Sequence, residues 1–122
     1  MSSIKKIVKD SSKNLYNINL YRNETKIANY NFIVNDKSVT INNLEVKIKN
    51  KGIGTTILNN IENYVKNIYD VNKVNLLAWQ DSSSDNVINF FKKNGYKIIN
   101  KNENGYDDSV IIYDLYHFEK DI

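Results

Sequence analysis

Residues 44–55 of this chain read Leu-Glu-Val-Lys-Ile-Lys-Asn-Lys-Gly-Ile-Gly-Thr, and the pattern of apolar residues changes across this stretch. Before it, apolar and polar residues broadly alternate, which is typical of strands with one buried face. After it, apolar residues recur every three or four positions, as on one face of an α-helix: Ile53, Ile57, Leu58, Ile61, Tyr64, Val65 and Ile68. The stretch is therefore predicted to connect a strand to the clearest helix in the chain.

On the N-terminal side of this stretch, the sequence predicts strands separated by turns. Residues 15–21, 27–34 and 39–46 are rich in β-forming residues, and the turn-like segments 23–25 and 35–37 separate them. A further short strand is expected around residues 4–8. These segments predict an antiparallel arrangement, beginning with a hairpin.

On the C-terminal side, residues 74–79 form a short apolar run that predicts a buried strand. Residues 82–85 offer several N-caps for a short second helix, which Gly95 would end in a left-handed conformation. Residues 96–99 and 110–116 are predicted to be strands around a turn at Gly105. The expected order is four strands, a helix, a strand, a helix and two strands.

Composition limits the class of protein. The chain has 122 residues, 41% of them hydrophobic and 25% charged, so we expect one globular domain over residues 1–122. The lack of cysteine excludes disulfides and a cysteine nucleophile, and the single histidine, His117, predicts no metal site. No apolar run is long enough to cross a membrane and no leader is apparent, so a cytoplasmic protein without membrane contact is expected.

Gly52 and Gly54 lie where the predicted strand passes into the helix. Glycines at such a position let several backbone N–H groups approach an anion, and the helix N-terminus adds partial positive charge. A phosphate site and a tight connection flanked by solvated lysines are equally compatible with the glycines alone. The P-loop pattern is disfavoured because Thr55-Thr56 follows the second glycine, and a dinucleotide loop is disfavoured because Ile57 replaces its third glycine.

The glycine stretch and a second segment together resemble the GCN5-related N-acetyltransferase (GNAT) family. Residues 49–54 are similar to the motif of Arg or Gln, two residues, Gly, any residue, and Gly or Ala, with Lys49 in the Arg/Gln position. Residues 87–96 are similar to the second signature, an apolar helix ending in Gly and an aromatic residue. The resemblance implies the acyl-CoA N-acyltransferase fold of the α/β (α+β) class, with a mixed, mostly antiparallel sheet of six or seven strands and two main helices.

The same resemblance implies an acetyl-CoA-dependent enzyme that transfers an acetyl group to a primary amine. Leu44 and Val46 would bind acetyl-CoA through their main chains, next to a gap between the strands at 40–46 and 74–79. The other implied coenzyme-binding residues are Lys49, Asn50, Lys51, Gly52, Ile53, Gly54, Thr55 and Asn86. Glu45 is the candidate general base, although a carboxylate paired with a neighbouring lysine explains it equally well. His117 is a weaker candidate.

Two features depart from the family pattern. Phe91 stands where the family usually has a tyrosine that protonates the leaving thiolate, so water, Tyr96 or Tyr113 would have to serve, or the thiolate leaves unprotonated. Only residues 9–14 are available where the family usually inserts two helices that wall the acceptor site. An open acceptor side would suit a lysine on a protein surface.

Two other classes of function stay open. A catalytically silent acyl-CoA-binding or protein-interaction module on the same fold would explain Phe91. A nucleic-acid-binding domain would use Lys47, Lys49 and Lys51, but the net charge of +3 disfavours it. A homodimer is compatible with the sequence.

Overall fold

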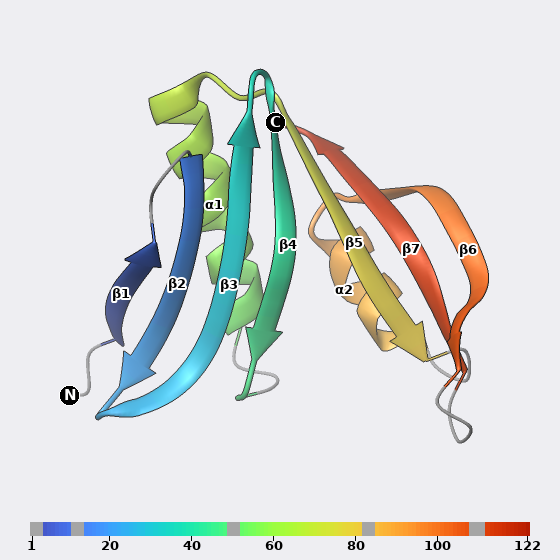
Figure 1. Cartoon of the computed structure of the whole chain (residues 1–122), viewed down its shortest axis with the longest axis horizontal. Helices are drawn as coiled ribbons and strands as arrows, with labels where there is room; N and C mark the ends of the chain where they lie inside the picture. The colour runs from blue at the N-terminus through green and yellow to red at the C-terminus, as the bar shows by residue number, and fades with distance from the viewer. Residues whose placement is uncertain (1–3, 11–13, 49–51, 82–84, 108–111) are drawn as a thin grey trace.

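A computed structural model describes residues 4–10, 14–48, 52–81, 85–107 and 112–122. Its elements are β1 (Ile4–Asp10), β2 (Leu15–Arg22), β3 (Thr25–Asn35), β4 (Ser38–Val46), α1 (Ile53–Tyr69), β5 (Lys73–Asp81), α2 (Asn86–Lys93), β6 (Lys97–Asp107) and β7 (Ile112–Asp121). The order of strands and helices is the one that the sequence predicts (Figure 1).

One seven-stranded sheet contains these strands, in the order β1-β2-β3-β4-β5-β7-β6. Neighbouring strands are antiparallel except β4 and β5, which are parallel. A parallel pair needs a crossover connection, and α1 provides it. The prediction of a mixed, mostly antiparallel sheet with two helices is confirmed.

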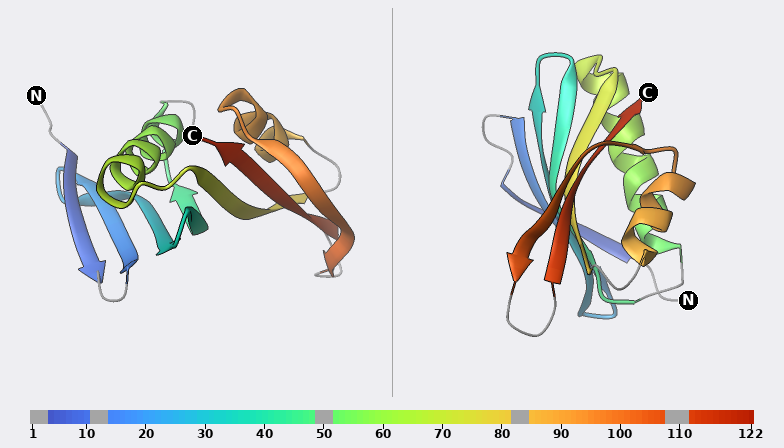
Figure 2. Two further views of the ribbon diagram at one scale, coloured as in Figure 1. Left: turned by 90° about the horizontal axis from the view of Figure 1, so that it is seen from above. Right: turned by 90° about the vertical axis from the view of Figure 1, so that its right-hand side faces the viewer.

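Both helices lie on the same side of the sheet, so the sheet has a helix side and a helix-free side (Figure 2). The core fills the helix side, between the sheet and the two helices. Its buried apolar residues include Ile18, Tyr30, Phe32, Val39, Ile41, Ile57, Leu58, Ile61, Val65, Val74, Leu76 and Phe118. Among the described helices, none is long and apolar enough to cross a membrane.

The structure corrects the predicted C-terminal strands. Gly105 is not at a turn, because it lies inside β6, which continues to Asp107. The register of β6 against β7 shifts between Asn102 and Tyr106, so the residues around Gly105 form an irregularity in the strand. β7 extends to Asp121, which places His117 in the middle of a strand instead of at the end of one.

The connection between the first two strands is short. β1 ends at Asp10 and β2 begins at Leu15, which leaves no room for a helical pair. The helix-free side of the sheet is therefore not covered by helices from this part of the chain.

Candidate functional site

The two parallel strands separate along their length. β4 pairs with β5 only over Ser38–Ile41 and Lys73–Leu76, although the strands continue to Val46 and Asp81. Figure 1 shows them diverging from the top of the sheet toward their C-terminal ends. Backbone groups that face each other across this divergence have no partner in the other strand, so they can bind an extended ligand.

A β-bulge lies where the strands separate. In the pairing of β4 with β3, Ile41 lies opposite Phe32 and Asn43 opposite Asn31, so Asn42 is an extra residue in β4. A bulge bends its strand and increases the local twist. This explains why β4 turns away from β5 immediately after Ile41.

The N-terminus of α1 lies near the C-terminal end of β4 (Figure 1). Gly52 is the N-cap residue with φ 72°, in the left-handed region, and no side chain caps the helix. The first turn contains no acidic residue, and Thr56 N–H is hydrogen-bonded to Gly52 O at 3.0 Å. The N–H groups before Thr56 therefore begin the helix without intrahelical acceptors, and the helix dipole favours an anion there.

The structural reason for a glycine at position 54 differs from the reason at position 52. A Cβ atom added at Gly54 would lie 2.8 Å from Cζ of Phe90, whereas one added at Gly52 would meet nothing within 4 Å. Gly54 is therefore needed for the close packing of α2 on the start of α1. Sequence reasoning attributed both glycines to the loop and missed this contact.

The N-terminus of α2 is capped from β5. Oε1 of Gln80 accepts hydrogen bonds from the N–H groups of Val87 at 2.7 Å and Ile88 at 3.2 Å. Nε2 of Gln80 donates to the Asn86 side chain at 3.1 Å, so Asn86 belongs to this cap. Asp85 is the N-cap residue but makes no side-chain cap bond. The predicted caps at residues 82–84 lie outside the described residues.

Sequence reasoning missed Gln80. It is 2% exposed, at the end of an otherwise apolar strand. A buried glutamine needs hydrogen-bond partners, and a helix N-terminus six residues later supplies them. A glutamine at the end of a predicted buried strand was therefore the feature of the sequence from which this helix cap could have been predicted.

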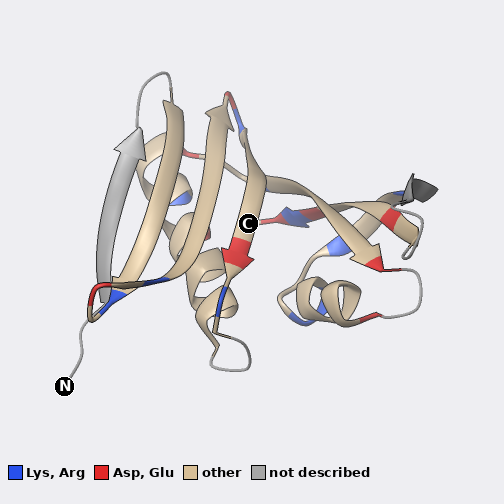
Figure 3. Ribbon diagram, turned by 60° about the horizontal axis from the view of Figure 1, so that its bottom comes forward, with Lys and Arg blue, Asp and Glu red and all other residues tan. Residues whose placement is uncertain are grey.

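The residues of β4 near the divergence point alternately to the two sides of the sheet. Leu44 and Val46 pack against the core on the helix side. Glu45 lies between them, is exposed, and therefore points to the helix-free side. On β5, Asp81 shares the helix-free side with Leu77 and Trp79, because Leu76 and Gln80 are buried. Figure 3 shows acidic residues at the ends of both β4 and β5.

Glu45 adjoins a row of asparagines on the helix-free side. Its partner in the β3–β4 register is Asn29. Asn29 accepts a hydrogen bond from Asn43 at 2.8 Å and donates one to Asn19 at 2.8 Å. Among the described residues no ion pair involves Glu45, so these residues do not support the alternative that it pairs with a lysine.

Three predicted coenzyme-binding residues, Lys49, Asn50 and Lys51, lie outside the described residues. Of the others, Ile53 is buried and Thr55 is half-buried in the first turn of α1. The structure thus brings Leu44, Val46 and this turn to one end of the molecule.

Phe91 and Tyr96 belong to the core. Phe91 is 7% exposed, with its ring centroid 5.0 Å from that of Phe118. The Tyr96 hydroxyl donates to Glu62 at 2.9 Å, and burial together with the Glu62 charge raises the pKa of Tyr96 well above its usual range. Tyr96 is therefore held by the fold and is unsuited to protonating a thiolate. His117 is half-buried opposite Leu77, and Tyr113 lies opposite Asp81.

Glu62 also connects α1 to β7 and to the end of α2. Its Oε1 accepts a hydrogen bond from Lys120 at 2.8 Å, and Lys120 donates to the backbone O of Asn94 at 2.9 Å. One carboxylate of α1 thus holds β7 and the end of α2. The Glu62 contacts lie on the helix side of the sheet, whereas β4 and β5 diverge within the sheet itself.

No protein-family model and no curated protein sequence matches the chain. Solved structures do match it. A GNAT family acetyltransferase from Elizabethkingia anophelis with acetyl-CoA bound has a TM-score of 0.75 at 15% identity, covering 98% of each chain. The ribosomal-protein-S18-alanine N-acetyltransferase from Escherichia coli has a TM-score of 0.80 at 15% identity, covering 100% of this chain and 94% of that one.

A third match is Arabidopsis thaliana Naa50 in complex with the bisubstrate analogue CoA-Ac-MVNAL, with a TM-score of 0.69 at 21% identity, covering 87% of this chain and 72% of that one. At these identities the likeness concerns the fold. The chain has the fold of the GNAT acetyltransferases, as the resemblance in its sequence predicts.

Proposed function

We propose that this chain is an N-acetyltransferase that uses acetyl-CoA to acetylate a primary amine. The observation that carries the proposal is the divergence of β4 from β5 beside the uncapped N-terminus of α1. Unpaired strand groups suit the amide-bearing pantetheine arm, and helix N–H groups without an acidic neighbour suit a pyrophosphate. The fold shared with acetyltransferases that bind acetyl-CoA supports this assignment.

In this proposal, Leu44 and Val46 bind acetyl-CoA through their main chains, and the first turn of α1, with Gly52, Ile53, Gly54 and Thr55, holds the pyrophosphate. Lys49, Asn50 and Lys51 would add positive charge and N–H groups from the same loop. Asn86 would contact the coenzyme from the start of α2. The open space around a Cβ at Gly52 is compatible with a ligand approaching the backbone there.

The transfer needs a neutral amine and a base. The amine nitrogen attacks the acetyl carbonyl carbon, a C–N bond forms, the C–S bond breaks and the thiolate leaves. Glu45, or a water that it holds, takes the proton of the amine. A main-chain N–H of β4 directed at the developing oxyanion would contribute about 3 kcal/mol. With Phe91 and Tyr96 in the core, the thiolate leaves unprotonated or takes a proton from water or Tyr113.

The acceptor would approach the helix-free side, where Glu45 and Asp81 lie on the two diverging strands. Carboxylates on both sides of the opening attract a cationic amine. Leu77 is 57% exposed and Trp79 48% exposed on the same side, and they offer apolar contact to a large acceptor. These features favour a lysine on a protein surface over a small buried amine.

Coenzyme binding is tested by the thermal shift with CoA, because a ligand at 100 times its dissociation constant adds about 2.7 kcal/mol of stability. Thr55→Glu should abolish the shift, since its carboxylate would repel the pyrophosphate. The fold should persist because an acidic residue in a first turn stabilises a helix by about 0.3–1 kcal/mol. Asn59→Glu, on an exposed position of α1, is the matched control. An unchanged shift in Thr55→Glu would contradict the proposed site.

Turnover distinguishes the enzyme from the alternative, a silent acyl-CoA-binding module, which the buried Phe91 favours. Thiol release is measured with a lysine peptide, n-butylamine and a polyamine. Glu45→Gln should lower kcat about 100-fold without changing the CoA shift. CoA binding without thiol release from any amine would favour the silent module. Turnover of the polyamine but not of the peptide would contradict a protein acceptor.

A further inference from the structure

A small pocket lies between α1 and the helix side of β2 and β3. Its volume is about 120 Å³, and its lining residues are Tyr16, Ile18, Tyr30, Phe32, Asn60, Ile61 and Tyr64. None of these residues belongs to β4, β5 or the first turn of α1. The pocket is therefore separate from the proposed acetyl-CoA site.

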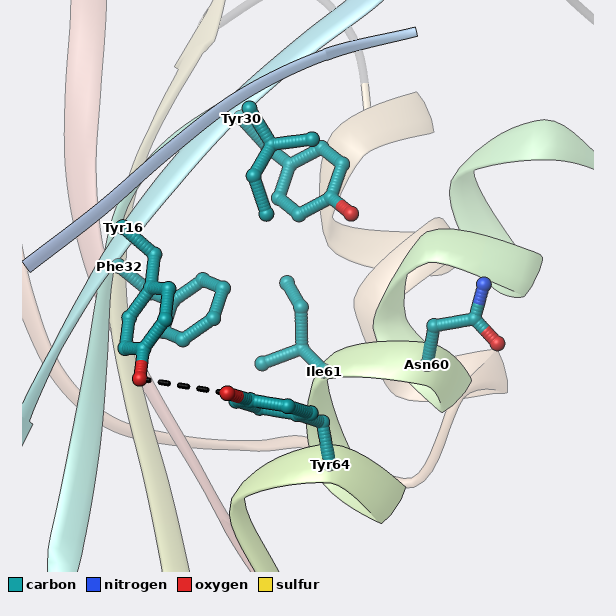
Figure 4. A pocket seen from close by; sticks show the side chains of 7 residues that line it. Tyr16, Tyr30, Phe32, Asn60, Ile61 and Tyr64 are labelled. Atoms are coloured by element: carbon teal, nitrogen blue, oxygen red, sulfur yellow. Dashed lines mark hydrogen bonds between the residues drawn. The ribbon is translucent and has the colours of Figure 1, made fainter. Parts of the chain in front are cut away.

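The floor of the pocket is apolar and aromatic. Ile18, Phe32 and Ile61 are each 1–2% exposed, and the ring of Tyr16 stacks on that of Phe32 with their centroids 4.9 Å apart. Figure 4 shows Tyr16, Phe32 and Tyr30 on the sheet side and Ile61, Asn60 and Tyr64 on α1 around the same space. A flat apolar ligand could contact both surfaces at once.

Tyr30 supplies a polar group that faces the pocket. The residue is 2% exposed, and its hydroxyl points from the sheet toward α1 (Figure 4). No hydrogen bond to this hydroxyl occurs among the residues that the structure describes. Burial raises the pKa of Tyr30 to about 12, so the hydroxyl is neutral near pH 7 and can donate and accept.

Three other tyrosine hydroxyls are already paired at one end of the pocket. The Tyr16 hydroxyl contacts that of Tyr69, and Tyr64 donates to Tyr16 at 3.3 Å. Tyr30 differs from them because it directs its hydroxyl toward α1 with no such partner. Among the described residues, the fully buried polar atoms without a partner do not include the Tyr30 hydroxyl, so this hydroxyl is reachable from the pocket and can bond to a ligand or an ordered water.

Size and lining decide between water and a larger ligand. A single water needs roughly 10–15 Å³ and two to four polar partners, whereas a cavity of about 150 Å³ with apolar walls binds benzene. At about 120 Å³, with mostly apolar walls, the pocket is far larger than one water requires. An aromatic ring that carries one hydrogen-bonding group meets both the walls and the Tyr30 hydroxyl.

We propose that this pocket is a second binding site, for a small aromatic molecule of the size of phenol. The ring lies between Ile61 and the aromatic side chains of the sheet, and its hydroxyl is hydrogen-bonded to that of Tyr30. Asn60 and Tyr64, both exposed on α1, border the entrance.

Binding is measured by ligand-observed NMR with phenol and toluene on the whole chain. We expect phenol to saturate the protein with a dissociation constant of about 1 mM, which is ordinary for a ligand of this size. Tyr30→Phe should weaken phenol about fivefold, the effect of one lost hydrogen bond, and leave toluene unchanged.

A matched pair of variants locates the site. Asn60→Trp should fill the entrance and abolish binding of both probes, whereas Asn63→Trp, on an exposed position outside the pocket, should not. Equal binding by the two tryptophan variants would place the ligand elsewhere. Failure of phenol to saturate the wild-type chain, or an unchanged phenol affinity in Tyr30→Phe, would also overturn the proposal. None of these results depends on acetyl transfer.

Discussion

The two helices lie on the same side of one sheet but are held there in different ways. α1 has 17 residues, of which Ile53, Ile57, Leu58, Ile61, Glu62 and Val65 are buried. α2 has eight residues, and only Phe91 is buried. A helix of eight residues is marginal in water without tertiary support. α1 is therefore secured by its own apolar face, whereas α2 depends on residues from β5 and α1.

The contacts of α2 follow from this dependence. Gln80 caps its first turn, and Gly54 allows Phe90 to approach α1. At its end, Tyr96 N–H bonds to Phe91 O at 3.0 Å and Gly95 has φ 92°. Because Phe90 packs on the first turn of α1, the position of α2 also shapes the proposed coenzyme site.

The largest effect is expected where a side chain of α1 supports β7 and the end of α2. Glu62→Ala removes the partner of the Tyr96 hydroxyl and the counter-charge of Lys120, whose ammonium keeps only the backbone O of Asn94 as a hydrogen-bond partner. We expect a loss of about 3 kcal/mol in the free energy of unfolding, measured with urea. Lys37→Ala, which breaks the exposed pair with Asp70, is the control and should cost less than about 0.5 kcal/mol. Equal losses of unfolding free energy in the two variants would mean that the Glu62 contacts do not hold α1 to β7 and α2.

Removing the cap of α2 tests its dependence on β5 directly. Gln80→Ala leaves the N–H groups of Val87 and Ile88 without their acceptor and should cost about 2 kcal/mol. Hydrogen exchange should accelerate in α2 and stay unchanged in α1. Uniform acceleration in both helices would show that α2 is not a separately stabilised element.

A double-mutant cycle sharpens the comparison at the contact between the helices. Gly54→Ala alone should destabilise the chain by about 1 kcal/mol, because its Cβ would clash with Phe90. In a Phe90→Leu background the same change should be neutral or stabilising, since alanine favours a helix more than glycine does. Additive effects would exclude a direct conflict between the two side chains.

The smallest expected effect is a pH-dependent loss of stability that comes from Tyr30, in the core under α1. The pKa of Tyr30 is raised from 10.0 to about 12 by burial, so the folded chain holds this proton more tightly than the unfolded chain. Its contribution is complete below pH 10 and is lost as the pH rises toward 12. By pH 11 the loss should be about 1 kcal/mol, and Tyr30→Phe should remove that part of the pH dependence of urea unfolding. An identical pH dependence in the variant would contradict the raised pKa.

The sequence predicted α1 better than α2 for the same physical reason. The three- and four-residue spacing from Ile53 to Ile68 specifies a long amphipathic helix without reference to other elements. For α2, the stop at Gly95 was readable, but the cap that the described residues show comes from Gln80 and not from Asp85. A cap supplied by a neighbouring strand has no fixed spacing in sequence, so local patterns do not reveal it.

The candidate site was predictable to a similar degree. The motif from Leu44 to Gly54 located the helix N-terminus, and the family resemblance implied a gap between the strands on either side of the helix. The bulge at Asn42 and the Phe90 contact with Gly54 were not predictable, because each depends on which residue lies opposite in space. The same holds for Gly105, which lies in an irregularity of β6 before the strand pairs with β7 again at Tyr106.

The sequence by itself determined the number, type and order of the elements, because apolar periodicity and turn residues act over a few neighbouring positions. Tertiary structure alone decided where β4 leaves β5, what caps α2, and that the Glu62 carboxylate joins α1 to β7. It also decided that Tyr30 directs its hydroxyl into a pocket. Such features depend on groups distant in sequence that packing and desolvation bring together.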